Sequence, residues 1–196
     1  MLIYMIRHGQ TDWNAEGRLQ GQQDVPLNDL GRSQARRNGE RLAMELRGQA
    51  TDFDYVASPL GRTRETMELL RAAMGLDPAA YRTEPRLMEL SFGDWQGSTL
   101  AELQRETPDR VEARATEKWD FIPPGDAAES YEILSWRVGS WLTSVDRPTV
   151  CVSHGGVVRS VFRLIGNWTK EDACEMNVPQ DRILKIDRDG SSVGWL

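Results

Sequence analysis

Three short apolar runs stand out in the hydrophobic pattern of the chain. They cover Leu2 to Ile6, Phe53 to Ser58 and Thr149 to Ser153. Uninterrupted runs of this length, rich in β-branched and aromatic residues, are typical of strands buried on both faces, as in parallel sheets. Because helical patterns separate these runs, the sequence predicts an α/β fold, a three-layer α/β/α sandwich with a mostly parallel central sheet.

Apolar residues at helical spacing predict four longer helices, over about 28–47, 58–74, 127–145 and 155–165. Asn28 is expected to cap the first helix, and Ser58-Pro59 to begin the second. The third has the clearest stripe, formed by Leu134, Val138, Trp141, Leu142 and Val145.

The remaining segments carry weaker patterns. Residues 10–27 lack periodicity and predict a long loop, a kind of segment that is often functional. Residues 98–118 predict two short helices broken at Thr107-Pro108. The segments 182–187 and 192–196 predict two strands joined by a turn at Asp189-Gly190. No repeat or linker interrupts the chain, which is therefore expected to form a single domain over residues 1–196.

Composition narrows the class of protein. Charged residues make up 28% of the chain and the net charge is −6, which disfavours binding to nucleic acid or to anionic membranes. Cys151 and Cys174 are too few for a disulfide framework, so we expect reduced thiols and a cytoplasmic location. The N-terminal apolar run is interrupted by Arg7, so neither a signal peptide nor a membrane span is expected.

Three strand-to-loop junctions carry side chains suited to a phosphoryl group, namely Arg7-His8, Arg62 and His154. In a parallel sheet these junctions lie at the same edge, where ligands bind. Guanidinium groups offer forked donors to phosphate oxygens. A neutral imidazole can act as a nucleophile, and a second, charged one can stabilise a transition state. Taken singly, each residue has a plainer interpretation as a structural histidine or a surface arginine.

Short motifs follow one another along nearly the whole chain. They are Arg7-His8-Gly9-Gln10-Thr11 with Asn14, Arg18-Leu-Gln-Gly21, Pro26-Leu27, Gly31 with Gln34-Ala35, Ser58-Pro-Leu-Gly-Arg62, Glu89-Leu-Ser-Phe-Gly93 with Trp95 and Gly97, and Ser153-His-Gly-Gly156. In this order they resemble the signature of the histidine phosphatase superfamily, in its phosphoglycerate mutase-like branch 1.

The resemblance implies a role for each matching residue. It implies that His8 attacks phosphorus and becomes a phosphohistidine, while Glu89 protonates the departing oxygen and then activates water. Taken alone, Glu89 is more simply a surface carboxylate. The catalytic set would be His8, Glu89, His154, Arg7 and Arg62. The substrate-binding set would be Arg7, Thr11, Asn14, Gln20, Gly21, Arg62, His154 and Gly155. No cofactor and no metal are expected, because two histidines without a carboxylate at ligand spacing make a poor metal site.

The pattern favours a phosphatase over a mutase. Acid-phosphatase relatives carry an aspartate where Gly155 stands, which leaves the proton-donor role to Glu89. Mutases resemble this pattern but usually carry a longer insertion and a C-terminal tail, whereas this chain ends at Trp195-Leu196. Water would then reach the phosphohistidine, so we expect hydrolysis of a small-molecule phosphate ester. The alternatives are phosphoryl transfer of the mutase type and, against the complete residue set, a silent phosphoester-binding module.

Residues 89–126 are expected to form a cap-like segment that sets specificity. Its apolar side chains would either line the substrate cavity or pack in the core; they are Leu90, Phe92, Trp95, Trp119 and Phe121. The chain departs from the resemblance at two places. Residues 124–130 are stretched relative to the compact Pro-Gly-Gly-Glu-Ser run of phosphatase relatives, and Gln180 replaces an asparagine. A homodimer is a possible assembly.

Overall fold

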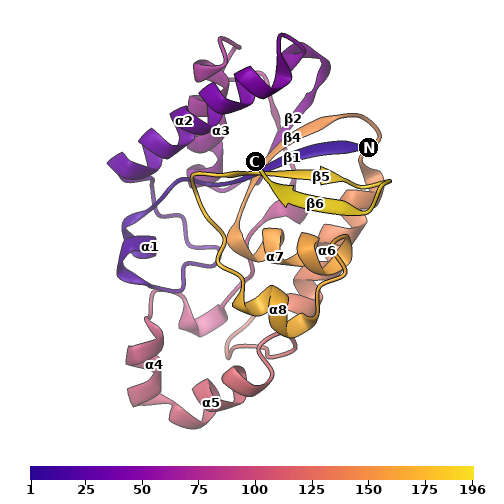
Figure 1. The fold of residues 1–196 in the computed structure, drawn as a ribbon. Helices are drawn as coiled ribbons and strands as arrows, with labels where there is room; N and C mark the ends of the chain where they lie inside the picture. Colours follow the sequence, from indigo (N-terminus) through magenta and orange to yellow (C-terminus); the bar gives the residue numbers. More distant parts are fainter.

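The computed structural model describes all residues from 1 to 196 and contains one six-stranded sheet (Figure 1). The strand order is β3-β2-β4-β1-β5-β6. The bounds are β1 Leu2–Arg7, β2 Asp54–Ala57, β3 Arg82–Thr83, β4 Thr149–Ser153, β5 Ile183–Asp187 and β6 Ser192–Trp195. Strands β1 to β4 run parallel, while β5 pairs antiparallel with β1 and β6 antiparallel with β5. The predicted strands and the mostly parallel sheet are confirmed.

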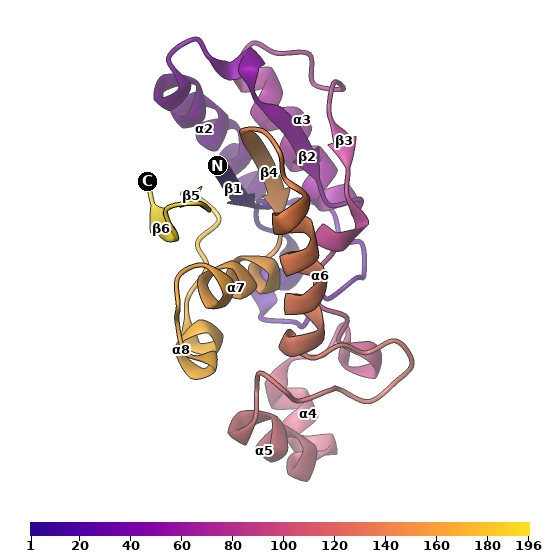
Figure 2. The ribbon, with the colours of Figure 1, turned by 90° about the vertical axis from the view of Figure 1, so that its right-hand side faces the viewer.

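Helices cover both faces of the sheet, as the views in Figures 1 and 2 show. Helices α2 (Asp29–Leu46) and α3 (Gly61–Ala73) lie on one face. Helices α6 (Tyr131–Ser144), α7 (Gly155–Leu164) and α8 (Lys170–Glu175) lie on the other. The predicted three-layer α/β/α sandwich is therefore confirmed.

Strand β1 has apolar side chains on both faces of the sheet, and helices bury both sets. Its side chains alternate between two separate hydrophobic clusters, since Tyr4 and Ile6 pack with α2 and α3, whereas Ile3 and Met5 pack with α6 and α7. All four are almost fully buried. A strand buried on both faces has the continuous apolar pattern that the sequence displays.

Two helix starts differ from the prediction. Helix α3 begins at Gly61, and its N-cap residue is Leu60, whose side chain has no acceptor to cap it; the Ser58 hydroxyl contacts His154 instead. Helix α6 begins at Tyr131 and not near residue 127, because Ser130 caps it. The preceding residues include Gly125 and Ala127 with φ of 103° and 56°, which are incompatible with a helix.

Two short helices were not predicted. Helix α1 (Asp12–Glu16) lies inside the segment expected to be a loop, and a capping box between Thr11 and Asn14 begins it. Helix α8 has six residues. Segments this short span fewer than two turns, so they cannot display a helical period. Each nevertheless carries a capping residue in the sequence, Thr11 before α1 and Thr169 before α8.

The segment between β3 and α6 extends away from the sheet on the side of α1 (Figure 1). After η2 (Pro85–Leu87) and η3 (Gly93–Trp95) come α4 (Leu100–Glu106) and α5 (Pro108–Thr116), broken at Thr107 as predicted. A further 3₁₀ turn, η1, covers Ala50–Asp52 before β2. That residues 89–126 act as a specificity cap stays a prediction. None of the helices combines the length and the apolar character required to span a membrane.

Candidate active site

Adjacent strands bring the two histidines together. Arg7 at the end of β1 pairs in register with Ser153 at the end of β4, so His8 and His154 leave the sheet side by side. The His8 N–H donates to the Ser153 carbonyl at 2.9 Å, and the two imidazole centroids lie 5.2 Å apart. The convergence expected from parallel-strand geometry is therefore present.

Arg62 joins the two imidazoles. Helix α3 follows β2, the neighbour of β4, and places Arg62 in its first turn. Its Nε lies 3.3 Å from His8 Nε2 and its Nη2 lies 3.3 Å from His154 Nδ1. The same guanidinium donates to the carbonyls of Gln23 and Gly21, each at 2.6 Å. Burial lowers the pKa of Arg62 to about 10, which leaves the group charged at neutral pH.

The hydrogen bonds of His8 define its tautomer. Its Nδ1 lies 2.8 Å from the Gly9 carbonyl, which can only accept, so Nδ1 carries the hydrogen. The lone pair is therefore on Nε2, which faces Arg62. Burial, reinforced by the charges of Arg62 and Arg7, holds the pKa of His8 well below its usual range. His8 is thus a neutral imidazole with its nucleophilic nitrogen directed into the site.

His154 has the opposite tautomer. Its Nδ1 faces Arg62, which can only donate, so the hydrogen lies on Nε2 and is donated to Ser58 Oγ at 2.8 Å. Burial and the Arg62 charge hold the pKa of His154 well below its usual range. The expectation of a charged second histidine therefore does not hold without a ligand, because a fully buried imidazole beside a guanidinium is neutral.

Two further guanidinium groups flank Gly155. A Cβ placed on this glycine would lie 3.4 Å from Arg159 Nη1 and 3.6 Å from Arg7 Nε. The Nε atoms of both arginines are buried and have no hydrogen-bond partner. Arg7 donates to the Val178 carbonyl at 2.7 Å, and Arg159 donates to the Met176 carbonyl at 3.0 Å and to the Tyr131 hydroxyl at 3.5 Å. Burial lowers the pKa of Arg7 to about 10, an effect that the Glu89 carboxylate opposes.

Backbone amides hold the Glu89 carboxylate. The Gly156 N–H, in the first turn of α7, donates to both carboxylate oxygens at 3.1 and 3.2 Å. The Leu90 N–H donates to Oε1 at 2.9 Å. A Cβ on Gly156 would lie only 2.3 Å from Glu89 Oε1, so a side chain at this position would displace the carboxylate.

These groups surround a cavity of about 140 Å³. Its lining is Arg7, His8, Asn14, Arg18, Leu19, Gln20, Gly21, Arg62, Glu89, Phe92, Tyr131, Gly155 and Arg159. Among the predicted site residues, only Thr11 and His154 are absent from the lining. His154 lies behind Arg62, and the Thr11 hydroxyl donates to Gln20 Oε1 at 3.0 Å. Four arginines against one carboxylate make the cavity strongly cationic.

Four lining residues were not assigned to the site from the sequence: Arg18, Leu19, Tyr131 and Arg159. Arg159 had a detectable signal, because a residue four positions after Gly155 returns to the same face of a helix. Tyr131 had none, since it enters the cavity through the packing of α6 against α7. Arg18 is partly neutralised by Glu16 and Glu102, at 2.6 and 2.9 Å, whereas Arg159 has no carboxylate partner.

Gln180, the second departure from the resemblance, fits the site. Its side-chain amide donates to the His8 carbonyl at 3.1 Å and to Asn14 Oδ1 at 3.0 Å. Asn14 in turn donates to Gln20 Oε1 at 3.3 Å. Gln180 therefore ties the chain before β5 to the backbone of His8.

Only one of the candidate wall residues faces the cavity, namely Phe92. Leu90, Trp95 and Trp119 are 2 to 3% exposed and belong to the core. Phe121 stacks on Trp95 with ring centroids 5.3 Å apart. The core-packing alternative therefore describes four of these five side chains.

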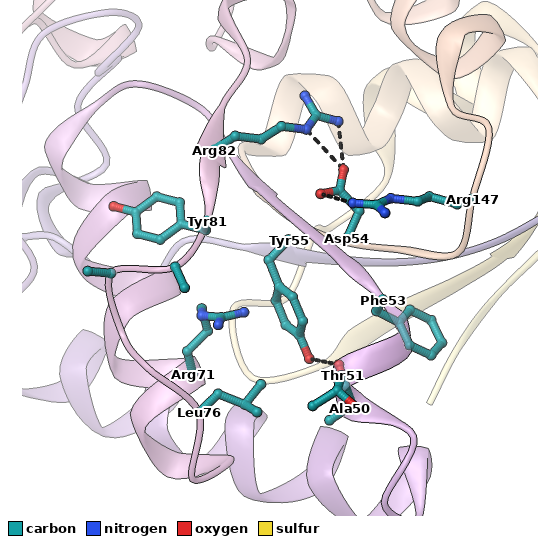
Figure 3. A pocket seen from close by; sticks show the side chains of 12 residues that line it. Ala50, Thr51, Phe53, Asp54, Tyr55, Arg71, Leu76, Tyr81, Arg82 and Arg147 are labelled. Carbon is teal, nitrogen blue, oxygen red and sulfur yellow. Dashed lines mark hydrogen bonds and ion pairs between the residues drawn. The ribbon is translucent and has the colours of Figure 1, made fainter.

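A larger cavity, of about 500 Å³, lies where β2 begins, at the opposite end of the parallel strands (Figure 3). Arg82 and Arg147 lie on either side of Asp54, at 2.8 and 3.5 Å. Arg71 lies over the Tyr55 ring at 4.1 Å. Neither histidine nor Glu89 contributes to it, so its size does not make it the reaction centre.

Comparison with known proteins agrees with this geometry. Residues 3–195 match the model of the histidine phosphatase superfamily (branch 1). The chain is 36% identical over 183 residues to the glucosyl-3-phosphoglycerate phosphatase of Mycobacterium tuberculosis, covering 85% of this chain and 78% of that protein. It is 32% identical to the probable phosphoglycerate mutase GpmB of Escherichia fergusonii, covering 99% and 89%.

The fold is likewise that of solved structures. The crystal structure of a putative alpha-ribazole-5'-P phosphatase from Escherichia coli K-12 superposes with a TM-score of 0.78 at 26% identity, covering 100% of this chain and 94% of that one. Sequence and structure thus agree over almost the full length of the chain. The protein is a histidine phosphatase enzyme and belongs to branch 1 of that superfamily.

Proposed function

We propose that this enzyme hydrolyses phosphomonoesters of small metabolites, without a metal ion, through a phosphohistidine on His8. The observation that carries the proposal is the neutral His8 imidazole, whose Nε2 lone pair faces Arg62 in a cavity lined by four arginines. Phosphoryl transfer requires positioning and charge neutralisation more than covalent chemistry from the protein, and this cavity supplies both.

In the first step, His8 Nε2 attacks phosphorus and the bond to the ester oxygen breaks. Glu89 gives its proton to the departing oxygen, so the alcohol leaves neutral. The guanidinium groups of Arg7, Arg62 and Arg159 balance the charge on the phosphoryl oxygens. The Nδ1–H bond to the Gly9 carbonyl, 2.8 Å long, supports the positive charge that develops on the imidazole.

In the second step, water attacks the phosphohistidine and Glu89 accepts a proton from it. The nitrogen–phosphorus bond breaks, inorganic phosphate leaves and His8 returns to its neutral form. One site serves both halves because attack and release occur along the same line through phosphorus. His154 supports Arg62 from behind, through the 3.3 Å contact at Nδ1.

Mutase-type phosphoryl transfer is the second candidate, favoured by the name of the GpmB relative, a probable phosphoglycerate mutase. Two other relatives are named as a phosphatase and a putative phosphatase of different phosphate esters, glucosyl-3-phosphoglycerate and alpha-ribazole-5'-P. These names favour hydrolysis without selecting an alcohol. A mutase would isomerise 3-phosphoglycerate in the presence of a bisphosphorylated primer and release little phosphate, whereas a phosphatase releases phosphate in proportion to substrate consumed.

The proposal is tested by hydrolysis of p-nitrophenyl phosphate in EDTA, with wild-type enzyme and His8→Ala. We expect full activity of the wild type in the chelator and none in the variant, with the two proteins equally folded by circular dichroism. Loss of activity in EDTA that zinc or magnesium restores would overturn metal independence. Undiminished hydrolysis by His8→Ala would overturn the nucleophile.

A further inference from the structure

The segment that carries Glu89 has no regular structure of its own. Residues 88–92 belong to neither a helix nor a strand. No ladder of backbone hydrogen bonds therefore fixes the position of Glu89, although an acid–base group must be held accurately to act. The backbone on both sides of Glu89 is bonded instead to Arg137, in the middle of α6, and to Glu129, which precedes this helix.

All five N–H groups of the Arg137 guanidinium donate to the backbone around Glu89 or to Glu129. Its Nη1 donates to the carbonyls of Arg86 and Met88, at 2.9 and 2.6 Å. Its Nη2 donates to the Glu89 carbonyl at 3.0 Å and to Glu129 Oε2 at 2.8 Å, and its Nε donates to Glu129 Oε1 at 2.9 Å. A guanidinium has five N–H groups, so none is left for a substrate.

Glu129 binds the same segment on the C-terminal side of Glu89, and Arg137 and Glu129 together are called the clamp below. Its carboxylate binds Arg137 in a forked pair and also accepts the Ser91 N–H at 3.1 Å. Its own N–H donates to the Ser91 carbonyl at 2.9 Å. The side chains of Arg137 and Glu129 are 20% and 16% exposed, so the pair is shielded from water. The stretched loop over residues 124–130 thus still delivers a glutamate to the backbone beside Glu89.

We propose that Arg137, locked by Glu129, is a positioning residue that aims the Glu89 carboxyl at the ester oxygen. This inference rests on the proposed function, in which Glu89 is the proton donor. Arg137 touches neither the cavity nor the carboxylate of Glu89, but it binds the carbonyl of the same residue. Loosening it shifts Glu89 away from the leaving oxygen while His8, Arg7 and Arg62 keep their contacts.

The leaving group distinguishes this role from a merely structural one. An alkoxide is a poor leaving group and needs the proton, whereas 2,4-dinitrophenolate leaves readily without it. A fault in proton donation therefore slows alkyl esters selectively, while a general disturbance of the site slows both kinds of ester alike. The parameter to compare is kcat/KM, because it covers only the steps up to phosphohistidine formation.

The experiment measures kcat/KM for glycerol 3-phosphate and for 2,4-dinitrophenyl phosphate in wild type, Arg137→Gln and Glu89→Gln. For Arg137→Gln we expect a loss of about 100-fold with the alkyl ester and of less than about 3-fold with the aryl ester. The double variant, which combines Arg137→Gln with Glu89→Gln, should have the same kcat/KM for glycerol 3-phosphate as Glu89→Gln alone, because Arg137 acts through Glu89. The control is Arg147→Gln, an exposed arginine paired with Asp54 far from the site, which should match wild type.

Arg137→Lys separates position from charge. If Arg137 acted only through its charge on the buried His154, the lysine variant would be as active as wild type. If Arg137 acts through its five hydrogen bonds, lysine cannot replace it, because an ammonium group has only three donors. Should Arg137→Gln fail to fold, Glu129→Gln tests the same clamp and is expected to show a smaller loss of the same selectivity. Equal losses with both esters, or full rescue by lysine, would overturn the positioning role.

The two proposals fail in different ways. If Glu89→Gln itself slows both esters equally, Glu89 is not the proton donor and the proposed mechanism falls. If Glu89→Gln is selective for the alkyl ester but Arg137→Gln is not, only the role of Arg137 falls.

Discussion

Arg62 connects the two histidines, and its fixed geometry explains the state of both. One guanidinium reaches His8 Nε2, His154 Nδ1 and two carbonyls, while its side chain is almost completely buried. A planar fork can meet four acceptors in this way, whereas an ammonium on a flexible stem cannot. The identity of this residue therefore matters beyond its charge.

Replacement of Arg62 by lysine tests that statement. We expect Arg62→Lys to lower kcat/KM for any phosphomonoester by roughly 10²- to 10³-fold, because the charge stays but the fixed contacts to His8, His154 and the two carbonyls are lost. Steady-state kinetics measure the change, and thermal unfolding verifies the fold. Activity within about 3-fold of wild type would mean that charge alone suffices.

Both imidazoles are expected to stay neutral in mildly acidic solution. The chain has only two histidines, so their NMR ring signals are simple to assign. Because burial holds the pKa of each well below its usual range, neither ring should show the titration midpoint of an ordinary histidine, near about 6.5. A midpoint near about 6.5 for either ring would contradict the buried, Arg62-bound arrangement.

The same shifts have a consequence for stability. Below about pH 6.5 an unfolded histidine binds a proton that the folded one does not, so the free energy of unfolding falls as the pH decreases. Each histidine contributes a slope of up to about 1.4 kcal/mol per pH unit, and the effect is absent above its unfolded pKa. Urea titrations of wild type and His8→Asn at several pH values measure it; the variant should have the shallower slope.

At the scale of elements, the longer helices and most strands were predictable, as were the short helices α4 and α5, whereas α1 and α8 were not. The hydrophobic pattern predicts strand β1 and helix α7. Helix α8 spans less than two turns, so no helical period can be recognised in its sequence. Ser58-Pro59 was misassigned as a helix start because the Ser58 hydroxyl binds His154, a tertiary contact that no local pattern reveals. Arg7, His8, Arg62 and His154 were found because each stands at or just beyond the end of a strand.

Two helical glycines make a matched pair. A Cβ on Gly156 in α7 would press on Glu89 Oε1 at 2.3 Å, while one on Gly139 in α6 would meet only Leu164 at 3.7 Å. We expect Gly156→Ala to lower kcat/KM for alkyl phosphates by at least about 10-fold by displacing Glu89. Gly139→Ala should keep full activity and gain about 0.5–1 kcal/mol of stability. Kinetics and urea unfolding of both variants check this, and an active Gly156→Ala would contradict the placement of Glu89.

At the scale of the whole molecule, an acidic protein surrounds a cationic cavity. The net charge is −6, yet four arginines and one glutamate line the site. The sheet topology explains how these arginines come together. Strands β2, β4 and β1 are neighbours and run parallel, so the residues that follow them lie at the same edge of the sheet. The sequence predicted that edge from strand alternation. It did not predict Arg159, Gln180 or Arg137, whose contacts depend on how helices and loops pack across the sheet.

The cavity should bind inorganic phosphate, the product of the proposed reaction. At a concentration about 100 times its dissociation constant, phosphate stabilises the folded protein by about 2.7 kcal/mol. We expect the melting temperature to rise by roughly 5–10 °C, less in Arg62→Lys. Differential scanning calorimetry at constant ionic strength, with chloride as the control anion, measures the shift. An equal shift with chloride would indicate a general salt effect.

The most direct test of the account is to trap the phosphoenzyme. Enzyme mixed with a ³²P-labelled phosphomonoester is quenched in alkali within a turnover, digested and mapped. We predict a label that is stable in base and labile in acid, on the peptide that contains His8, and absent from His8→Ala. A label on another residue, or full turnover with no labelled protein at any quench time, would contradict a phosphohistidine on His8.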